Sequence, residues 1–318
     1  MKKIKPTISI VIPIYNGSLY VESLLQSIFS LNYRDFEVIF INDGSTDDTL
    51  DKLEKYICGC GELQCKIIDQ QNQGVANARN SGIMNANGDW LFFLDADDQI
   101  TPDYFDFINA VDIFSEYKDF SLLIIDGVVD YFGEKEIKWE TPKTKNINFD
   151  NVDFALNSKI MRYVWGKLYR RNYILDKSIS FEKHKIAEDF LFNIRLCVEG
   201  VEIKVIHSGY YKYNQNVTSI TKSYTADNLL SRLNVVLRIK DILPQDNGNR
   251  IKKIYMEFFL YQTLKHLKKT TKVDREKILS VIKKNSNYFS IKQIPFLSLK
   301  IKGKLYFFVL IIKYGLWG

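Results

Sequence analysis

The sequence of 318 residues is poor in residues that build metal clusters and disulfide scaffolds, with only four cysteines and three histidines. Cys58, Cys60 and Cys65 lie close together, but they lack the paired Cys-x-x-Cys spacing and the histidine partner that zinc sites usually have. No apolar run is long enough for a membrane-spanning helix, and the stretch 8–14 is too short for the apolar core of a signal peptide. These absences argue against a zinc site and favour a cytoplasmic protein whose thiols are reduced.

Two fingerprints of nucleotide-binding proteins are also missing. Neither a G-x-G-x-x-G motif nor a Walker phosphate loop occurs, and no internal repeat is visible. What remains is the composition of an ordinary globular protein, with 46% hydrophobic and 26% charged residues. The length is sufficient for one α/β domain with an extension.

The net charge of +6 is unevenly distributed along the chain. Residues 250–318 carry 16 basic and 3 acidic side chains, a net charge of +13, which leaves −7 for residues 1–249. Such a basic tail suits an anionic surface, either lipid or nucleic acid. Because no recognised nucleic-acid motif accompanies it, we expect no nucleic-acid partner and predict peripheral membrane contact through this segment. The alternative is a helical subdomain that packs on the rest of the chain with a solvated basic face.

Short apolar strands alternate with helices over the first 130 residues. Strands are predicted at 7–14, 36–41, 65–68, 90–94 and 121–130, and helices at 19–29, from Thr46 or Asp47 to 56, at 75–86, and from Pro102. This alternation predicts an α/β fold with a mainly parallel sheet flanked by helices. Further along, we expect an irregular segment at 133–160, helices at 165–174 and 188–197, β-structure within 201–213, and helices from 226 onward.

Acidic turns follow two of the predicted strands. Ligands of parallel sheets bind beyond the carboxyl ends of the strands, where Asp43, Asp95 and Asp97 are expected. Several carboxylates within residues 95–98 repel one another unless a cation neutralises them, and oxygen ligands suit Mg²⁺ or Mn²⁺. The alternative is an acidic turn that caps the following helix.

Two side chains near this edge suit a nucleotide. Asp43 can accept hydrogen bonds from a base N–H or a ribose hydroxyl, and Tyr15, which follows Pro13, can stack on a base. Asp43 can equally be a turn and helix-cap residue, and Tyr15 can equally be a packed aromatic side chain.

Four segments in fixed order resemble the catalytic domain of glycosyltransferase family 2, which has the GT-A fold. They are 9–16 (SIVIPIYN), 38–49 (VIFINDGSTDDT), 72–82 (NQGVANARNSG) and 88–98 (GDWLFFLDADD). Later segments resemble bacterial members that build surface polysaccharides, namely 167–171 (KLYRR), 188–193 (EDFLFN) and 213–221 (YNQNVTSIT). The resemblance implies a catalytic domain over 1–222, with a nucleotide-binding half (1–100) and an acceptor-binding half (101–222). A basic helical C-terminal extension would occupy 223–318.

The resemblance also implies roles on the donor side of the site. Asp43 would contact the uracil or ribose of the donor, together with Pro13 and Tyr15. Asp97 would bind the divalent ion directly, and Asp95 would contact the ribose or the waters of the ion.

Further roles follow from the same resemblance. Arg79 would lie near the nucleotide or brace the acidic loop, and a purely structural role is equally open. Asp189 would be the general base, and Glu188 and Trp165 would lie on the acceptor side. First-turn acids that stabilise a helix N-terminus are the alternative for Glu188 and Asp189. A packed core tryptophan is the alternative for Trp165.

These roles imply an inverting enzyme that moves a single sugar from a nucleotide diphosphate donor, with UDP-sugars favoured, to an acceptor hydroxyl. A lipid-linked oligosaccharide acceptor would explain contact with the inner face of the cell membrane. The chain lacks the Gln-x-x-Arg-Trp motif of processive synthases, which favours one sugar per encounter. Asn214 stands where relatives often have an arginine, which leaves Lys212 and Lys222 as candidates to contact the pyrophosphate instead.

Two other classes of protein remain open at this point. A nucleotidyltransferase can share this architecture and metal chemistry, but it is expected to carry a glycine-rich basic loop where this chain has 15–19 (YNGSL). A non-catalytic nucleotide-sugar-binding protein would have kept the fold without turnover.

Overall fold

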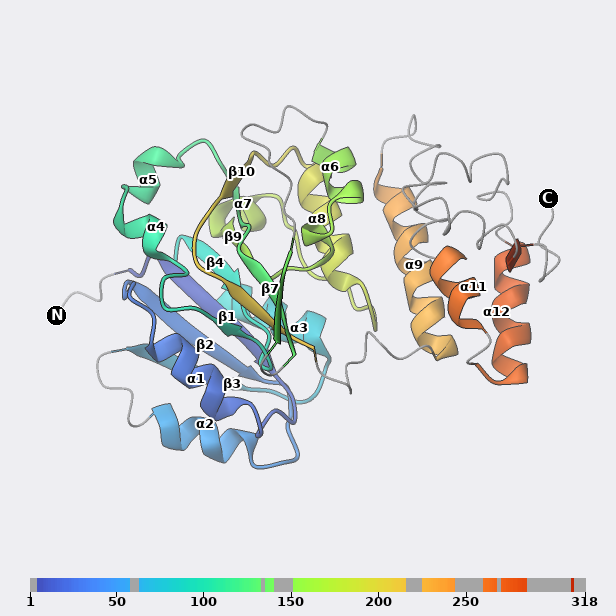
Figure 1. The fold of residues 1–318 in the computed structure, drawn as a ribbon, viewed down its shortest axis with the longest axis horizontal. Coiled ribbons are helices and arrows are strands. Elements are labelled where there is room, and N and C mark those ends of the chain that lie inside the picture. The colour runs from blue at the N-terminus through green and yellow to red at the C-terminus, as the bar shows by residue number, and fades with distance from the viewer. Residues whose placement is uncertain are drawn as a thin grey trace. The chain divides into compact units, whose positions relative to one another are not determined.

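The computed structural model describes residues 5–57, 63–132, 135–139, 151–215, 225–243, 260–267, 270–284 and 310–311 (Figure 1). The chain divides into two compact units, which we describe separately. The first comprises residues 1–183 and 192–216, and the second comprises residues 184–191 and 217–318. The predicted domain boundary after residue 222 lies outside the described residues.

A seven-stranded sheet forms the centre of the first unit, in the order β10-β6-β9-β4-β1-β2-β3 (Figure 1). Its strands are β1 (Ile8–Ile14), β2 (Phe36–Asn42), β3 (Gln64–Asp69), β4 (Trp90–Phe93), β6 (Leu122–Ile125), β9 (Lys167–Arg170) and β10 (Ile203–Ile206). All neighbouring pairs are parallel except those of β9, which runs antiparallel to both β4 and β6. All seven residues of β1 are buried, because a central parallel strand is covered on both faces. The predicted mainly parallel sheet is therefore confirmed.

Three helices connect the first four strands, namely α1 (Val21–Phe29), α2 (Thr49–Ile57) and α3 (Val75–Asn85). The Asp47 carboxylate accepts a hydrogen bond from the backbone N–H of Thr49 at 3.1 Å, so of the two predicted caps of α2 it is Asp47 that acts. Helix α3 packs closely on β1 at Gly82. A Cβ atom at this position would lie 2.2 Å from Cγ1 of Val11. The remaining helices of this unit are α4 (Asp106–Asn109), α5 (Ile113–Glu116), α6 (Asn151–Asn157), the 3₁₀ turn Ile160–Arg162, α7 (Arg171–Asp176) and most of α8 (Glu188–Val198).

A second sheet has the order β5-β11-β7-β8, with β5 (Gln99–Ile100), β7 (Val128–Phe132), β8 (Lys135–Lys138) and β11 (Tyr211–Asn214). The prediction of one continuous strand at 121–130 was therefore wrong, because β6 pairs with β10 in the large sheet and β7 pairs with β11 in the small one. The chain changes sheets at Gly127, where a Cβ atom would lie 1.8 Å from the carbonyl oxygen of Gly209. Only glycine allows this close approach of two backbones.

The predicted helix at 165–174 was also wrong over its first half. Residues Lys167–Arg170 form strand β9, and α7 begins only at Arg171. The local apolar spacing suits a helix, but β9 fills the position between β4 and β6 and takes hydrogen bonds from both. Tertiary pairing decides the structure here over local pattern.

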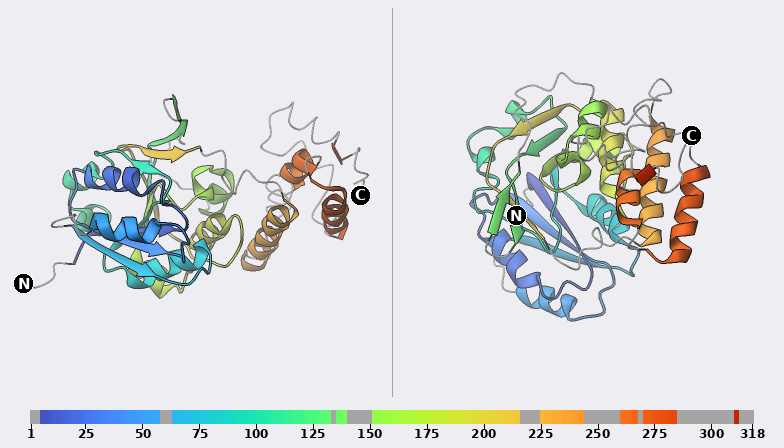
Figure 2. Two further views of the ribbon diagram at one scale, coloured as in Figure 1. Left: turned by 90° about the horizontal axis from the view of Figure 1, so that it is seen from below. Right: turned by 45° about the vertical axis from the view of Figure 1, so that its right-hand side comes forward.

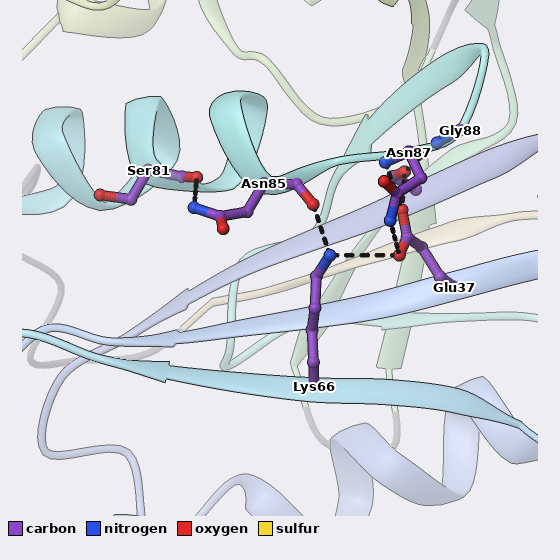
Figure 3. Close-up of polar contacts among 7 residues, drawn as sticks. Glu37, Lys66, Ser81, Asn85, Asn87 and Gly88 are labelled. Carbon is purple, nitrogen blue, oxygen red and sulfur yellow. Dashed lines mark hydrogen bonds and ion pairs between the residues drawn. The ribbon is translucent and has the colours of Figure 1, made fainter.

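A buried carboxylate joins three strands and a loop at the amino edge of the large sheet (Figure 3). Glu37 in β2 is 3% exposed. Its Oε1 accepts hydrogen bonds from Oγ of Ser9 (2.6 Å) and from the backbone N–H of Asn87 (2.6 Å). Its Oε2 accepts from Nδ2 of Asn87 (3.1 Å) and pairs with Nζ of Lys66 (3.3 Å), which also donates to the carbonyl of Asn85. Burial alone would raise the pKa of Glu37, but these hydrogen bonds and the Lys66 charge outweigh it and lower the pKa.

The described helices of the second unit are α9 (Ala226–Ile242), α11 (Gln262–His266) and α12 (Lys272–Lys284), in addition to the first turn of α8. Helix α9 packs beside α12 (Figure 2). Oγ of Ser231 in α9 accepts hydrogen bonds from the backbone N–H groups of Lys185 (3.1 Å) and Ile186 (3.2 Å), which ties the segment 184–191 to this helix. Among the described residues, no helix has the length and apolar character needed to cross a membrane. Most of the basic tail lies outside the described residues, so its contact with a membrane stays a prediction.

Candidate active site

Loops from three parallel strands lie together at the carboxyl edge of the large sheet. Hydrogen bonds join the loop after β1 to the loop after β2 and the start of α2. The backbone N–H of Asn16 donates to Oγ of Ser45 (2.9 Å), that of Gly17 donates to Oγ1 of Thr49 (2.9 Å), and that of Thr46 donates to Oδ1 of Asn16 (2.8 Å). Because β4 runs parallel beside β1, its acidic loop reaches the same edge.

Asp43, at the end of β2, holds a neighbouring loop in place. It is 3% exposed, and its Oδ1 accepts from Nε2 of Gln70 (2.7 Å) and from the backbone N–H of Gln73 (3.0 Å). Its Oδ2 accepts from the backbone N–H of Gly74 (2.7 Å). A carboxylate has about four acceptor positions. Described residues use three of them, and we expect a ligand to use the fourth.

The two other residues predicted on the nucleotide side differ in exposure. Tyr15 is 52% exposed as a residue, so its ring is open to a ligand. Pro13 is buried inside β1, opposite Ile41 of β2. A direct nucleotide contact stays a prediction for both residues, and for Pro13 it would have to involve the backbone.

Arg79 braces the acidic loop, one of the roles predicted for it. Arg79 lies in α3, and the residue is 3% exposed. Nη2 lies 2.9 Å from Oδ1 of Asp95, and the guanidinium lies 5.4 Å from the centre of the Phe181 ring. The ion pair holds one carboxylate of the loop in a fixed direction.

Asp98 has a role that the sequence did not reveal. It is 1% exposed and accepts hydrogen bonds from the hydroxyl of Tyr211 (2.6 Å) and from the backbone N–H of Asn214 (2.7 Å). Burial, together with the nearby charges of Asp95 and Asp97, raises the pKa of Asp98 well above its usual range. No sequence signal identifies this pair, because the two side chains are 113 residues apart.

The carboxylates of the loop fit a divalent ion that shares its coordination with a ligand. Asp95 and Asp97 are half-buried, whereas Asp98 is buried and turned to Tyr211 and Asn214. Within the described ranges, no group of three or more His, Cys, Asp or Glu side chains is arranged to hold a metal by itself. Mg²⁺ and Mn²⁺ bound with nucleotides take one or two carboxylates and complete their shell with phosphate oxygens and water. Asp95 and Asp97 meet this requirement.

Trp165 lies in the core and not on an open surface. It is 1% exposed, and its ring stacks on Tyr163 (centroids 4.6 Å apart, 24° between planes) and on Tyr211 (4.6 Å, 10°). A buried ring with two stacked neighbours offers no face to a sugar. The predicted acceptor contact of Trp165 is therefore replaced by a packing role.

Glu188 and Asp189 are the first two residues of α8 and belong to the second unit. Glu188 is buried and Asp189 is half-buried. The preceding residue, Ala187, has a φ of 69°, a left-handed backbone conformation that is costly for alanine. The roles of both acids in acceptor binding and proton transfer stay predictions.

Lys212 is engaged elsewhere in the small sheet. Its Nζ lies 3.2 Å from Oε1 of Glu136 and 5.6 Å from the centre of the Tyr131 ring. Lys222, the other cation considered for a pyrophosphate, lies outside the described residues.

Comparison with known proteins agrees with this architecture. The family model described as glycosyl transferase family 2 matches residues 9–176, more than half of the chain. The chain therefore belongs to glycosyl transferase family 2. The uncharacterized glycosyltransferase EpsJ of Bacillus subtilis (strain 168) is 28% identical over 226 residues, which cover 68% of this chain and 63% of EpsJ. The match thus spans a little less than two thirds of that relative.

Two solved structures show the same fold. The crystal structure of residues 1–349 of TarS from S. aureus, in complex with UDP-GlcNAc, has a TM-score of 0.70 at 20% identity and covers 98% of this chain and 89% of that one. The mannosyltransferase PcManGT from Pyrobaculum calidifontis, in complex with GDP-Man and Mn²⁺, has a TM-score of 0.58 at 14% identity and covers 98% and 88%. These similarities confirm the predicted GT-A fold.

Proposed function

We propose that this chain transfers one sugar from a nucleotide diphosphate donor to an acceptor hydroxyl, with inversion at the sugar. The observation that carries the proposal is the convergence of exposed Tyr15, braced Asp43 and the Asp95–Asp97 loop at one edge of the sheet. UDP-sugars are the favoured donors, because the TarS structure contains UDP-GlcNAc. The acceptor proposed is a lipid-linked oligosaccharide in surface polysaccharide synthesis, reached at the inner face of the cell membrane.

Each residue at the edge then has a task in donor binding. Tyr15 stacks on the base, and Asp43 accepts a hydrogen bond from the base or ribose with its remaining acceptor position. Asp97 would bind Mn²⁺ or Mg²⁺ directly, Asp95 would contact the ribose or the waters of the ion, and Arg79 holds the Asp95 carboxylate in place. A divalent ion bound there offsets the negative charge that grows on the leaving diphosphate.

Asp189 is proposed to take the proton from the acceptor hydroxyl. A hydroxyl is a poor nucleophile at neutral pH, and a carboxylate within hydrogen-bond reach lowers the barrier by accepting its proton during attack. Attack on the face opposite the leaving diphosphate gives inversion in one displacement. Glu188 is proposed to lie on the acceptor side, next to this base.

Donor binding can be tested by thermal unfolding of the chain with a panel of nucleotide diphosphate sugars, with and without Mn²⁺. A ligand that binds only the folded state raises the unfolding temperature by mass action. We expect a UDP-sugar to stabilise the chain and the stabilisation to require the ion. A uniform lack of response across the panel contradicts the proposal.

The Asp189→Asn variant separates a transferase from a protein that only binds nucleotide sugars. We expect it to keep the donor-induced rise in unfolding temperature while sugar transfer falls by at least about 100-fold, the usual contribution of a general base. Asp227→Asn is the matched control, because Asp227 lies in the same unit with a side chain that is 72% exposed. Equal transfer rates in the two variants would exclude Asp189 as the base.

A further inference from the structure

Tyr211 hydrogen-bonds to the acidic loop, and it is fixed through both its hydroxyl and its ring. Its hydroxyl donates to Oδ2 of Asp98 (2.6 Å) and accepts from the backbone N–H of Asp95 (3.4 Å). Its ring is fully buried and stacks on Trp165. A phenol held in this way has very little freedom to move.

The segment that carries Trp165, the ring stacked on Tyr211, is itself held in place. Nζ of the buried Lys167 donates to the carbonyls of Tyr163 (2.7 Å) and Trp165 (3.2 Å). Nδ2 of Asn193 donates to the carbonyl of Tyr163 at 2.8 Å. All these residues belong to the first unit. The stack Tyr163–Trp165–Tyr211 therefore rests on a segment whose backbone is fixed by two buried side chains.

Asp98 connects this support to the acidic loop. Its backbone N–H donates to the carbonyl of Asp95 at 3.0 Å, which closes a tight turn around Asp97. Its carboxylate bonds to β11 at two points, the hydroxyl of Tyr211 and the backbone N–H of Asn214. The turn that carries Asp95 and Asp97 is thus attached to the small sheet by Asp98 and to α3 by Arg79.

We propose that Asp98 and Tyr211 are positioning residues that hold Asp95 and Asp97 ready for a divalent ion shared with the donor diphosphate. This inference rests on the proposed function. Asp95 and Asp97 repel each other before the ion arrives, so a loop without support would move them apart. The hydrogen bonds of Asp98 keep the backbone of the turn in place, and the ion then meets ligands that need no rearrangement.

The test compares two buried tyrosines by removing one hydroxyl from each. Tyr211→Phe keeps the ring stacked on Trp165 and removes both hydrogen bonds to the loop. Tyr104→Phe is the matched control, because Tyr104 is equally buried, its ring lies 6.5 Å from that of Tyr211, and its hydroxyl has no hydrogen-bond partner within the described part of the chain. The measurement is the dissociation constant of UDP by titration calorimetry, with and without Mn²⁺, which requires no turnover.

For the wild-type chain we expect Mn²⁺ to strengthen UDP binding. In Tyr211→Phe this gain should fall about tenfold, the usual effect of losing a residue that supports a metal ligand. UDP binding without the ion should be unchanged, and Tyr104→Phe should behave as wild type. An equal gain in Tyr211→Phe and wild type overturns the inference, and so does a loss of UDP affinity that is the same with and without the ion.

Asp98→Asn provides a second route that remains available if Tyr211→Phe does not fold. It should reduce the Mn²⁺-dependent gain in the same way, and in a folded double variant the two losses should not add, because both remove one linkage. Additive losses would overturn the inference. If Mn²⁺ does not change the UDP affinity of the wild-type chain, both the proposed function and this inference are overturned. If Mn²⁺ strengthens UDP binding equally in the wild-type chain and in the variants, only this inference is overturned.

Discussion

Replacing Glu37 by glutamine tests how the amino edge of the sheet is held together (Figure 3). The carboxylate accepts two hydrogen bonds on each oxygen, counting the Lys66 ion pair. Glutamine has one carbonyl oxygen, which can keep two of the four contacts. Its amide N–H₂ then faces two donors and cannot accept their hydrogen bonds. Hydrogen bonds to a charged group contribute roughly 1.5–3 kcal/mol each, and the share of Lys66 lies at the low end because its side chain is 35% exposed. We expect the free energy of unfolding to fall by about 2–4 kcal/mol at neutral pH.

The pH dependence of this loss has a definite sign. The pKa of Glu37 is lowered by folding, so its contribution is fully present above the pKa of an unfolded glutamate, about 4.3, and is lost as pH falls through the folded value. The difference between wild type and Glu37→Gln should therefore be constant from neutral pH down to about 4.3 and narrow below it.

Urea unfolding followed by circular dichroism measures this difference. Glu54→Gln on the exposed side of α2 is the matched control and should change the free energy by less than about 0.5 kcal/mol. A Glu37→Gln loss no larger than the control would refute the reasoning. A loss that persisted undiminished in acid would refute the assignment to the charge.

Three further substitutions test the donor side. Tyr15→Ala should weaken UDP binding by about 1–3 kcal/mol without lowering the unfolding temperature, because its side chain is exposed, and Tyr15→Phe should restore binding. Asp43→Asn should weaken UDP binding about tenfold in calorimetry, because the amide N–H₂ replaces one of the two oxygens, either the acceptor of Gln70 and Gln73 or that of Gly74. Asp51→Asn on the surface of α2 should have no effect. Asp97→Asn should remove the Mn²⁺-dependent part of UDP-induced thermal stabilisation and leave any ion-independent part in place.

Much of the fold follows from local pattern, and the exceptions are places where distant segments pair. The strand β1 and the helix α3 were predicted within one or two residues, because apolar spacing and a following turn mark each of them. The break at Gly127 and the strand β9 were missed. Both depend on partners elsewhere in the chain, Gly209 for the first and the strands β4 and β6 for the second.

The same division runs through the candidate site. The acids at the strand ends could be predicted without a structure, because a carboxylate after a buried apolar strand can be located by pattern alone. Four short motifs in order also identified the family. The folded chain was needed to show that Arg79 braces Asp95, that Trp165 is a core ring, and that Asp98 faces Tyr211. Those facts depend on contacts between side chains far apart in the chain, and the position of each such partner is fixed only when the whole sheet has formed.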